Sequence, residues 1–340
     1  MGQLPPLVRA LLKGDAYPEN PRHVDLMQTQ MSFVFLLGDF AYKIKKPVDL
    51  GYLDFSTLEK RHFYCRQEVE LNSRLAPEIY LGVVEVTQNE GRFFVGGTGE
   101  VVEYAVKMRQ LPRERCLDRL LARDEATPAM LVKVAQKLVR FHQASRSDEE
   151  ISRYGDIETI VQNTEENFAQ TTKYIKVSLS QEIYDGIKSY TTSFIERQTP
   201  LFKRRIEEGK IRDCHGDLHS AHICFGDEVY IFDCIEFNDR FRYCDVASEV
   251  AFLAMDLDVH GYPHLSRHFI DSYVGLSGDR ELEQLLNFYR CYRAYVRGKV
   301  ESFKLDDPHI SDEEKGRVLG IARRYFELAE SYALRGEWEG

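Results

Sequence analysis

The sequence predicts an α+β protein of two lobes: an antiparallel sheet with one helix forms the N-terminal lobe, and the C-terminal lobe is larger and mainly helical. First, 340 residues exceed the usual size of one domain, so two lobes that share a cleft are the natural expectation. Second, the first third contains short runs of β-branched and aromatic residues separated by turn residues. Third, helical patterns dominate after Leu111-Pro112. We therefore expect an N-terminal lobe of residues 1–108 and a C-terminal lobe of residues 109–340.

The N-terminal lobe begins with a predicted β-hairpin. Phe33–Leu37 and Phe40–Lys45 flank Gly38-Asp39, a pair that favours a tight turn. A helix is expected over about Ser56–Leu75, because a Ser-Thr pair can cap its start, an apolar stripe reaches its end and a proline follows. Further strands are expected at Leu81–Val86, Arg92–Val95 and Val101–Met108.

The C-terminal lobe is expected to be helical, with one short strand. Ala129–His142 places apolar residues on one face at helical spacing. Helices are also expected near Ile157–Tyr174 and Gln181–Arg197, and again from Val246 to the end. The apolar run Val229–Phe232 predicts the strand.

Composition and charge narrow the classes of function. Hydrophobic residues make up 43% of the chain and charged residues 29%, as in ordinary globular proteins. A formal net charge of −10 argues against nucleic-acid binding, which depends on an excess of Lys and Arg. No run approaches the ~20 apolar residues that span a bilayer, and residues 1–15 lack the features of a signal peptide. We expect a cytoplasmic protein that binds neither nucleic acid nor membrane.

The seven cysteines are expected to be reduced thiols, because their number is odd and no secretion signal precedes them. Zinc sites usually contain a close Cys-x-x-Cys pair, and none occurs here. We interpret the ten-residue spacing of four cysteines as coincidence. These are Cys214, Cys224, Cys234 and Cys244.

The segment with the most chemical information contains His215-Gly216-Asp217 and is followed, after a turn and a short strand, by Asp233. Phosphoryl transfer needs one carboxylate that orients the acceptor hydroxyl and another that holds Mg²⁺ against the phosphates. Asp217 and Asp233 suit these two roles.

These residues resemble the aminoglycoside phosphotransferase-like small-molecule kinases of the protein-kinase-like superfamily. In that family the catalytic loop reads His-Gly-Asp, with an Asn five residues later and a metal-binding Asp after the next strand. Asp217 and Asp233 fall on the two acidic positions, and the likeness extends from about Gln28 to the final helices. The resemblance implies transfer of a phosphoryl group from ATP, with Mg²⁺ or Mn²⁺, to a hydroxyl group of a small molecule. It does not name the acceptor, because the same architecture serves choline, methylthioribose, homoserine and fructosamine.

The sequence departs from the family pattern at the Asn, whose position holds His222. Mg²⁺ prefers oxygen ligands, whereas imidazole suits softer metals, so His222 can orient phosphate, bind Mn²⁺ or contact no metal. Glu236, three residues beyond Asp233, is either a substitute metal ligand or a solvated or structural carboxylate.

The resemblance also implies a strand lysine for the α- and β-phosphates, held by a glutamate on the helix. Lys43 is our candidate, and Lys45 is the alternative because alternate residues of a strand share a face. Glu68 lies where the resemblance expects the glutamate, and Glu70 points to another face of the helix. An exposed lysine and a surface glutamate are the alternatives without a function.

Two further parts of a nucleotide site are expected. Neither a Gly-x-Gly-x-x-Gly loop nor a Walker motif occurs, so the turn Thr29–Ser32 is our candidate for covering the phosphates through Ser32 and backbone amides. Backbone groups near Lys107, Met108 and Arg109 are expected to hydrogen-bond adenine.

Charged residues in the C-terminal lobe allow several interpretations. Asp245 is read as structural support or as a helix N-cap. Asp256 and Asp258 either receive a cationic or sugar-like acceptor or are solvated. A late helix carries a stripe of cations, which we interpret as a solvated face rather than as a site for an anion. The stripe consists of Arg290, Arg293, Arg297 and Lys299.

Two other functions stay open. A metallohydrolase is suggested by the dense cluster of His215, Asp217, His219 and His222, although a hydrolytic zinc site would not need the strand lysine or the second aspartate. A pseudokinase or regulatory nucleotide-binding module is suggested by the missing Asn at position 222. The oligomeric state does not follow from the sequence.

Overall fold

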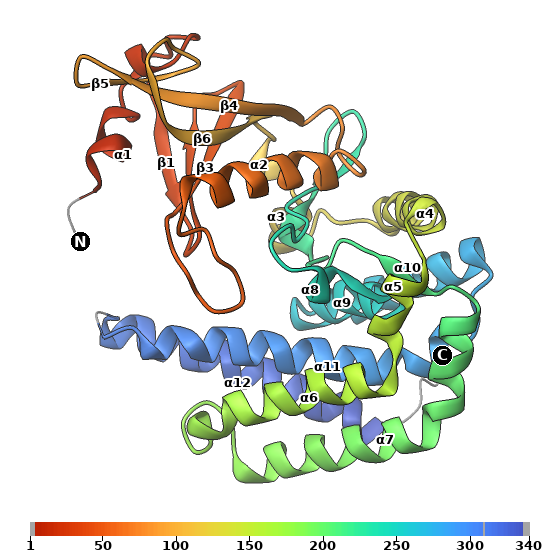
Figure 1. Cartoon of the computed structure of the whole chain (residues 1–340). Coiled ribbons are helices and arrows are strands. Elements are labelled where there is room, and N and C mark those ends of the chain that lie inside the picture. Colours follow the sequence, from red (N-terminus) through yellow and green to blue (C-terminus); the bar gives the residue numbers. More distant parts are fainter. Residues whose placement is uncertain (1–3, 309, 336–340) are drawn as a thin grey trace. The chain divides into compact units, whose positions relative to one another are not determined.

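The computed structural model describes residues 4–308 and 310–335, which form two compact units (Figure 1). One unit runs to Cys116 and also includes the later segment His222–Asp239. The other comprises Leu117–Ala221 and the chain from Arg240 onward. From the sequence we expect the lobe of residues 1–108 to bind the nucleotide and the lobe of residues 109–340 to carry the catalytic and substrate-binding residues, and this assignment stays a prediction.

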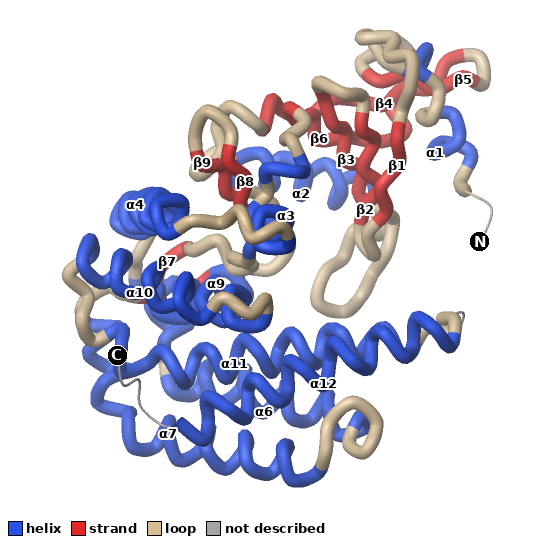
Figure 2. Tube along the Cα trace, turned by 180° about the vertical axis from the view of Figure 1, so that it is seen from behind, coloured by secondary structure: helices blue, strands red, loops and turns tan. Residues whose placement is uncertain are grey.

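A curled antiparallel sheet forms the centre of the first unit (Figures 1 and 2). The predicted hairpin is confirmed, with Leu36 opposite Ala41 and with Gly38 at φ +95°, a left-handed conformation that glycine adopts without strain. The strand order is β1 (Asp25–Gln28), β2 (Ser32–Leu36), β3 (Phe40–Lys45), β6 (Glu100–Arg109), β4 (Tyr80–Asn89) and β5 (Arg92–Val95). Strand β1 was not predicted.

The two faces of this sheet have different environments. Tyr42 and Ile44 of β3 pack in a core that includes residues of α1 (Pro6–Ala10) and of the short helix η1 (Gly14–Ala16). The alternate residues Lys43 and Lys45 reach α2 (Leu58–Asn72) on the opposite face. The sheet therefore presents two lysines side by side to one helix.

Helix α2 buries charged and polar side chains in addition to the expected apolar ones, among them Leu71. Its N-cap is Thr57, whose side chain accepts a hydrogen bond from the Lys60 N–H. Arg61 lies on the buried face and forms an ion pair with Glu103 of β6 at 2.8 Å. The buried residues of the helix are Arg61, Cys65, Glu68, Leu71 and Asn72. Because buried charges are tolerated only when they are paired, this helix is held to the sheet by specific partners.

The segment 222–239 adds a small hairpin to the first unit. Strands β8 (Ile223–Phe225) and β9 (Val229–Ile231) pair antiparallel, which confirms the predicted strand in this half of the chain. Two buried cysteines, Cys116 and Cys224, form an isolated β-bridge, and their sulfurs lie 2.9 Å apart. All seven cysteines are free thiols, as expected.

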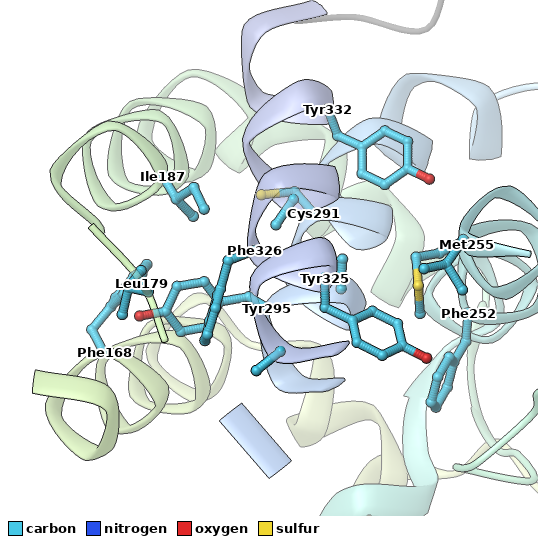
Figure 3. Packing of buried hydrophobic residues seen from close by; sticks show 14 residues of the cluster. Phe168, Leu179, Ile187, Phe252, Met255, Cys291, Tyr295, Tyr325, Phe326 and Tyr332 are labelled. Atoms are coloured by element: carbon cyan, nitrogen blue, oxygen red, sulfur yellow. The ribbon is translucent and has the colours of Figure 1, made fainter. Parts of the chain in front are cut away.

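The second unit is mainly helical, and its core is formed by α6, α7, α9, α11 and α12 (Figure 3). Phe326 and Tyr332 of α12 are fully buried there; the ring of Phe326 contacts Tyr295 of α11, which in turn contacts Phe168 of α6. Its helices are α3 (Leu117–Ala122), α4 (Pro128–Ala144), α5 (Glu149–Ser152), α6 (Ile157–Thr171), α7 (Gln181–Glu207), α9 (Val246–Val259), α10 (Pro263–Ser277), α11 (Leu282–Phe303) and α12 (Asp312–Arg335). Two short strands, β7 (Ile211–Asp213) and β10 (Tyr243–Asp245), pair with each other. Among the described residues, no helix has both the length and the apolar composition to cross a membrane.

Candidate active site

In the first unit, the structure brings together three of the residues predicted to bind nucleotide and metal. The Lys43 Nζ lies 2.8 Å from Glu68 Oε1 and 2.7 Å from Asp233 Oδ1. Burial alone would lower the pKa of Lys43, but the two carboxylates outweigh it and raise the pKa well above its usual value. The lysine is therefore a stable ammonium group beside the carboxylate that we expect to hold metal.

Lys45 belongs to the same cluster but has different partners. Its Nζ lies 2.6 Å from Glu68 Oε2 and also forms an ion pair with Glu236. Its side chain is 1% exposed and its ammonium lies 4.9 Å from the centre of the Phe55 ring. Glu236 is thus a buried ion-pair partner and not a solvated carboxylate.

The backbone at Asp233 is held in a conformation that is unusual for a residue with a side chain. Its φ is +63°, in the left-handed region. The Asp233 N–H donates to the Tyr80 hydroxyl at 3.1 Å, and the Cys234 N–H donates to Asn72 Oδ1 at 2.8 Å. The Asn72 amide also donates to the Glu68 carbonyl at 2.8 Å. The backbone turn at Asp233 is therefore fixed to both β4 and α2. This turn sets the direction of the Asp233 carboxylate.

His222 lies beside Asp233, the other residue predicted to contact the metal. The His222 Nε2 is 3.5 Å from Asp233 Oδ2, and its carbonyl accepts the Phe232 N–H at 3.0 Å. The Asp233 side chain is 44% exposed, so its carboxylate is partly accessible to solvent. Mg²⁺ is commonly bound by one or two carboxylates together with water and phosphate oxygens, so a single half-exposed carboxylate fits it, whereas the imidazole suits a softer ion.

The turn proposed to cover the phosphates is already hydrogen-bonded to itself. The N–H groups of Met31 and Ser32 both donate to Thr29 Oγ1, at 3.2 and 3.0 Å. Ser32 is 2% exposed and lies within β2, opposite Lys45. The expectation that Ser32 covers phosphate is therefore wrong for this conformation, because neither its hydroxyl nor its amide is accessible.

The expected adenine-binding residues lie at the end of β6. Lys107 and Met108 pair with β3 on one side and with β4 on the other, and the Arg109 N–H donates to the Ile79 carbonyl at 2.9 Å. The Lys107 side chain forms an ion pair with Glu19 at 2.6 Å on the sheet face that carries Tyr42. Their role in adenine binding stays a prediction, and pairing within the sheet limits which backbone groups can serve it.

In the second unit, the His215-Gly216-Asp217 loop is held by hydrogen bonds to a buried carboxylate. Glu249 Oε1 accepts the N–H groups of His215 and Gly216 at 2.8 and 2.7 Å. Its other oxygen lies 2.8 Å from His142 Nε2, and His142 Nδ1 lies 2.7 Å from the Tyr273 hydroxyl. Burial opposes ionisation of Glu249, but His142 and the loop outweigh it and lower its pKa.

Further bonds fix the two ends of this loop. Gly216 has φ +87°, and its carbonyl accepts a hydrogen bond from Arg293 at 3.3 Å. The Asp217 N–H donates to His215 Nδ1 at 3.3 Å, and the Ser220 N–H donates to Asp256 Oδ2 at 2.8 Å. The loop conformation is thus determined by side chains on α9 and α11.

The Asp217 carboxylate remains partly exposed at 31%. His219 Nε2 lies 3.5 Å from its Oδ2. Burial lowers the pKa of His219, but the charge of Asp217 outweighs it and the pKa is raised. Asp217 is therefore a partly exposed carboxylate beside His219, an arrangement that is compatible with orienting a hydroxyl group.

Several interpretations of charged residues need correction. The cationic stripe is not a solvated face, since Arg290 and Arg293 are 3% and 8% exposed. Arg290 pairs with Asp258, which also accepts a bond from the Tyr332 hydroxyl. Asp258 is therefore engaged in the core, and its proposed role in binding the acceptor is not supported.

Two other aspartates have structural roles. Asp256 is 4% exposed and holds the Ser220 N–H. Asp245 is the N-cap of α9 as predicted, accepting the Ala247 N–H at 2.8 Å, and it also pairs with buried Arg205 at 2.6 Å. Both carboxylates are used to assemble the unit.

Sequence reasoning missed the residues that brace the two aspartates. These are Asn72 and Tyr80 near Asp233, and His142, Glu249 and Arg293 near Asp217. One local signal was available, because Asn72 follows Glu68 by one helical turn and so shares its face. The partners of Glu249 are 107 and 34 residues away, so no local pattern indicates them.

Comparison with known proteins establishes the fold. No family model matches the chain. Uncharacterized proteins of Mycobacterium tuberculosis (strain ATCC 25618 / H37Rv) and Mycobacterium bovis are each 35% identical to it over 289 residues, 84% of this chain and 56% of theirs. The chain thus spans about half the length of the curated relatives it matches.

Two solved structures have the same fold as this chain. Amicoumacin kinase hAmiN, solved with AMP-PNP, Ca²⁺ and Ami, aligns with a TM-score of 0.50 and 10% identity over 94% of this chain and 91% of its own. An aminoglycoside phosphotransferase from Alicyclobacillus acidocaldarius aligns with a TM-score of 0.50 and 11% identity over 98% and 96%. The chain therefore has the two-lobed, protein-kinase-like fold of the aminoglycoside phosphotransferases, as the sequence predicted.

Proposed function

We propose that this protein is a small-molecule kinase that transfers a phosphoryl group from ATP to a hydroxyl group. The observation that carries the proposal is the Lys43, Glu68 and Asp233 cluster, in which Lys43 lies within 2.8 Å of two carboxylates that are 25 and 190 positions away along the chain. A lysine held between a buried helical glutamate and a half-exposed aspartate is what binding of nucleotide phosphates with a metal ion requires.

Asp233 would hold the metal, with His222 beside it as a second contact. The ion, when bound, neutralises charge on the phosphate oxygens. Lys43 donates to phosphate oxygens, and Glu68 keeps its ammonium oriented. The remaining contribution of the chain is to hold these groups in place before the nucleotide arrives.

Asp217 orients the acceptor hydroxyl and accepts its proton as the hydroxyl oxygen bonds to the γ-phosphorus of ATP, while the bond from that phosphorus to the bridging oxygen breaks and ADP leaves. The loop that carries it is fixed by Glu249 and Arg293, so its carboxylate needs little reorganisation. His219 lies 3.5 Å from the Asp217 carboxylate and stabilises its negative charge.

For adenine, we propose Leu111 in addition to the predicted Lys107, Met108 and Arg109. Leu111 follows β6 directly and packs against the core that contains Tyr80. Within the described parts of the chain, no hydrogen bond uses its N–H or its C=O. A purine edge needs one donor and one acceptor on neighbouring backbone groups, which this position offers.

The metallohydrolase hypothesis is less well supported. His215, one of its four candidate ligands, is fully buried, and its Nδ1 accepts the Asp217 N–H. The ring therefore braces the loop. The pseudokinase hypothesis is tested by the same experiments as the proposal.

The first test is thermal unfolding with ATP, GTP or no nucleotide, each with Mg²⁺, Mn²⁺ or Zn²⁺. At a hundredfold excess over Kd, a ligand of the folded state contributes about 2.7 kcal/mol, a rise of several degrees in Tm. We expect this rise with ATP and a divalent ion, and its loss in Asp233→Ala. Asp227→Ala is the matched control, because Asp227 lies exposed in the turn of the same hairpin.

The second test separates transfer from binding. Asp217→Asn should abolish consumption of ATP with a panel of hydroxyl compounds while leaving the nucleotide-induced rise in Tm intact, and Asp227→Asn should change neither. Stabilisation by Zn²⁺ alone would favour the metallohydrolase, and nucleotide binding without turnover on any acceptor would favour the regulatory module.

A further inference from the structure

The first unit contains a second lysine–glutamate pair that the proposed chemistry does not use. Lys43 donates a hydrogen bond to Asp233 and faces Glu68 Oε1 as an ion pair. Lys45 donates hydrogen bonds to Glu68 Oε2 and to Glu236. Glu68 therefore contacts Lys43 with one carboxylate oxygen and Lys45 with the other. Lys45 also pairs with Glu236, which Lys43 does not contact in this way.

The burial of this network makes each charge dependent on its partners. The side chains of Glu68 and Lys45 are 0% and 1% exposed, and that of Glu236 is 7% exposed. Removing one partner of a buried ion pair leaves an uncompensated charge and is strongly destabilising. If Lys43 were the only partner of Glu68, any movement of its ammonium toward phosphate would leave the glutamate alone in the interior. Lys45 gives Glu68 a second partner, because it donates a hydrogen bond to the other oxygen of the same carboxylate.

The second pair also connects three separate elements. Lys45 lies on β3, Glu68 on α2, and Glu236 three residues beyond Asp233. The segment that carries Asp233 is thus tied at its start to Tyr80 and three residues later to the strand that carries Lys43.

We infer that Lys45 and Glu236 are positioning residues of the nucleotide site: they keep Glu68 paired while Lys43 engages phosphate, and they fix the Asp233 segment to β3. This inference rests on the proposed function. It assigns Lys45, the alternative phosphate-binding lysine of the sequence, to a supporting role. It also assigns Glu236, the alternative metal ligand, to charge compensation of Lys45.

The test is a variant that removes the second pair and leaves the first intact. Lys45→Met/Glu236→Gln takes away one positive and one negative charge together, so that no uncompensated charge is buried. The matched control is Lys60→Met/Asp54→Asn, which removes an ion pair of the same unit whose side chains are 44% and 37% exposed. Glu236→Gln alone is the second variant, because it retains a hydrogen-bond acceptor for Lys45.

The measurement is the Kd of AMP-PNP by calorimetry, with and without Mg²⁺, on the full chain. We expect the paired variant to bind the Mg²⁺ complex on the order of ten- to a hundredfold more weakly, as displaced site groups usually cause, and to lose most of the gain that Mg²⁺ gives the wild type. The control variant should keep both values. A pair that only stabilises the fold would lower Tm and leave the ratio of the two Kd values unchanged.

The outcomes separate the two proposals. If the wild type binds AMP-PNP in a Mg²⁺-dependent way and Lys45→Met/Glu236→Gln has the same ratio of the Kd values with and without Mg²⁺, the positioning role is overturned. The proposed function then still stands. Absence of Mg²⁺-dependent binding by the wild type overturns the proposed function and this inference with it. If the paired variant does not fold, Glu236→Gln decides by the same ratio.

Discussion

Replacing Glu249 by Gln should weaken the attachment of the His215-Gly216-Asp217 loop to helix α9 and so destabilise the second unit. The substitution keeps size and shape but removes the negative charge that receives the His215 and Gly216 N–H groups and the His142 ring. The amide can still accept through one oxygen, yet it must place an NH₂ group where either the loop or His142 now finds an acceptor. The bonds to the loop and to His142 therefore lose the contribution of the negative charge.

The magnitude follows from the number and kind of these bonds. A hydrogen bond to a charged group contributes about 1.5–3 kcal/mol, and an unsatisfied buried donor costs about 1–3 kcal/mol more. With three such bonds weakened or lost, we expect a loss of about 3–5 kcal/mol, which corresponds to a fall in Tm of roughly 6–20 °C for a unit of this size. Glu150→Gln is the matched control, since that side chain is 78% exposed on the same unit and should shift Tm by less than about 1 °C.

The pH dependence of the stability difference between wild type and Glu249→Gln tests whether the charge of Glu249 is its cause. Burial opposes ionisation of Glu249, but His142 and the loop lower its pKa below that of an unfolded chain. A lowered carboxyl pKa contributes stability that is present above about pH 4.3 and is lost as the pH falls through the folded-state value. The difference between wild type and Glu249→Gln should thus shrink in acid. A variant that melts within 2 °C of the wild type at pH 7 would refute the idea that this carboxylate holds the loop in place.

Two further predictions concern buried charges of the second unit. Arg205→Met should cost about 3–5 kcal/mol in the free energy of unfolding by urea, because it leaves the buried carboxylates of Asp245 and Asp279 without their shared guanidinium; an unchanged urea midpoint would contradict this. Burial lowers the pKa of Lys299 to about 8, so between about pH 8 and 10.5 only the unfolded chain holds this proton and stability should rise with pH, by at most about 3 kcal/mol. Lys299→Met should remove that rise in urea titrations across this range, and a persistent rise would assign it to other groups.

How far the sequence predicted the site depends on whether each contact is local. Lys43 and Lys45 were expected on one face because strand side chains alternate, and both do reach Glu68. The order of strand, helix and Asp233 was visible through the resemblance. What the sequence could not decide was how one glutamate divides its oxygens between two lysines, because that depends on where Glu236 lies after the chain turns.

The failed interpretation of the cationic stripe has the same physical cause. Spacing along α11 correctly placed its arginines on one face, but spacing does not reveal what that face meets. Arg290 meets Asp258 and Arg293 meets the Gly216 carbonyl, partners 32 and 77 residues away. A charge stripe is solvated only when no buried acceptor lies opposite, and that information is tertiary.

The residue that stands in place of the family's Asn leads to a prediction about metal preference. His222 Nε2 lies 3.5 Å from Asp233 Oδ2, close enough for both to contact one ion. Imidazole favours Mn²⁺ over Mg²⁺ more strongly than an amide oxygen does. We therefore expect His222→Asn to shift the preference toward Mg²⁺, lowering the ratio of AMP-PNP affinity measured with Mn²⁺ to that measured with Mg²⁺.

The control is His23→Asn, the same substitution at a side chain of the same unit that is 79% exposed, which should leave the ratio unchanged. An unchanged ratio in His222→Asn would mean that the imidazole contacts no metal. Its role would then be to position Asp233 through their 3.5 Å contact, and the variant would change the affinity for the Mg²⁺ and Mn²⁺ complexes by the same factor. The two mechanisms thus differ in whether the choice of ion or the overall affinity changes.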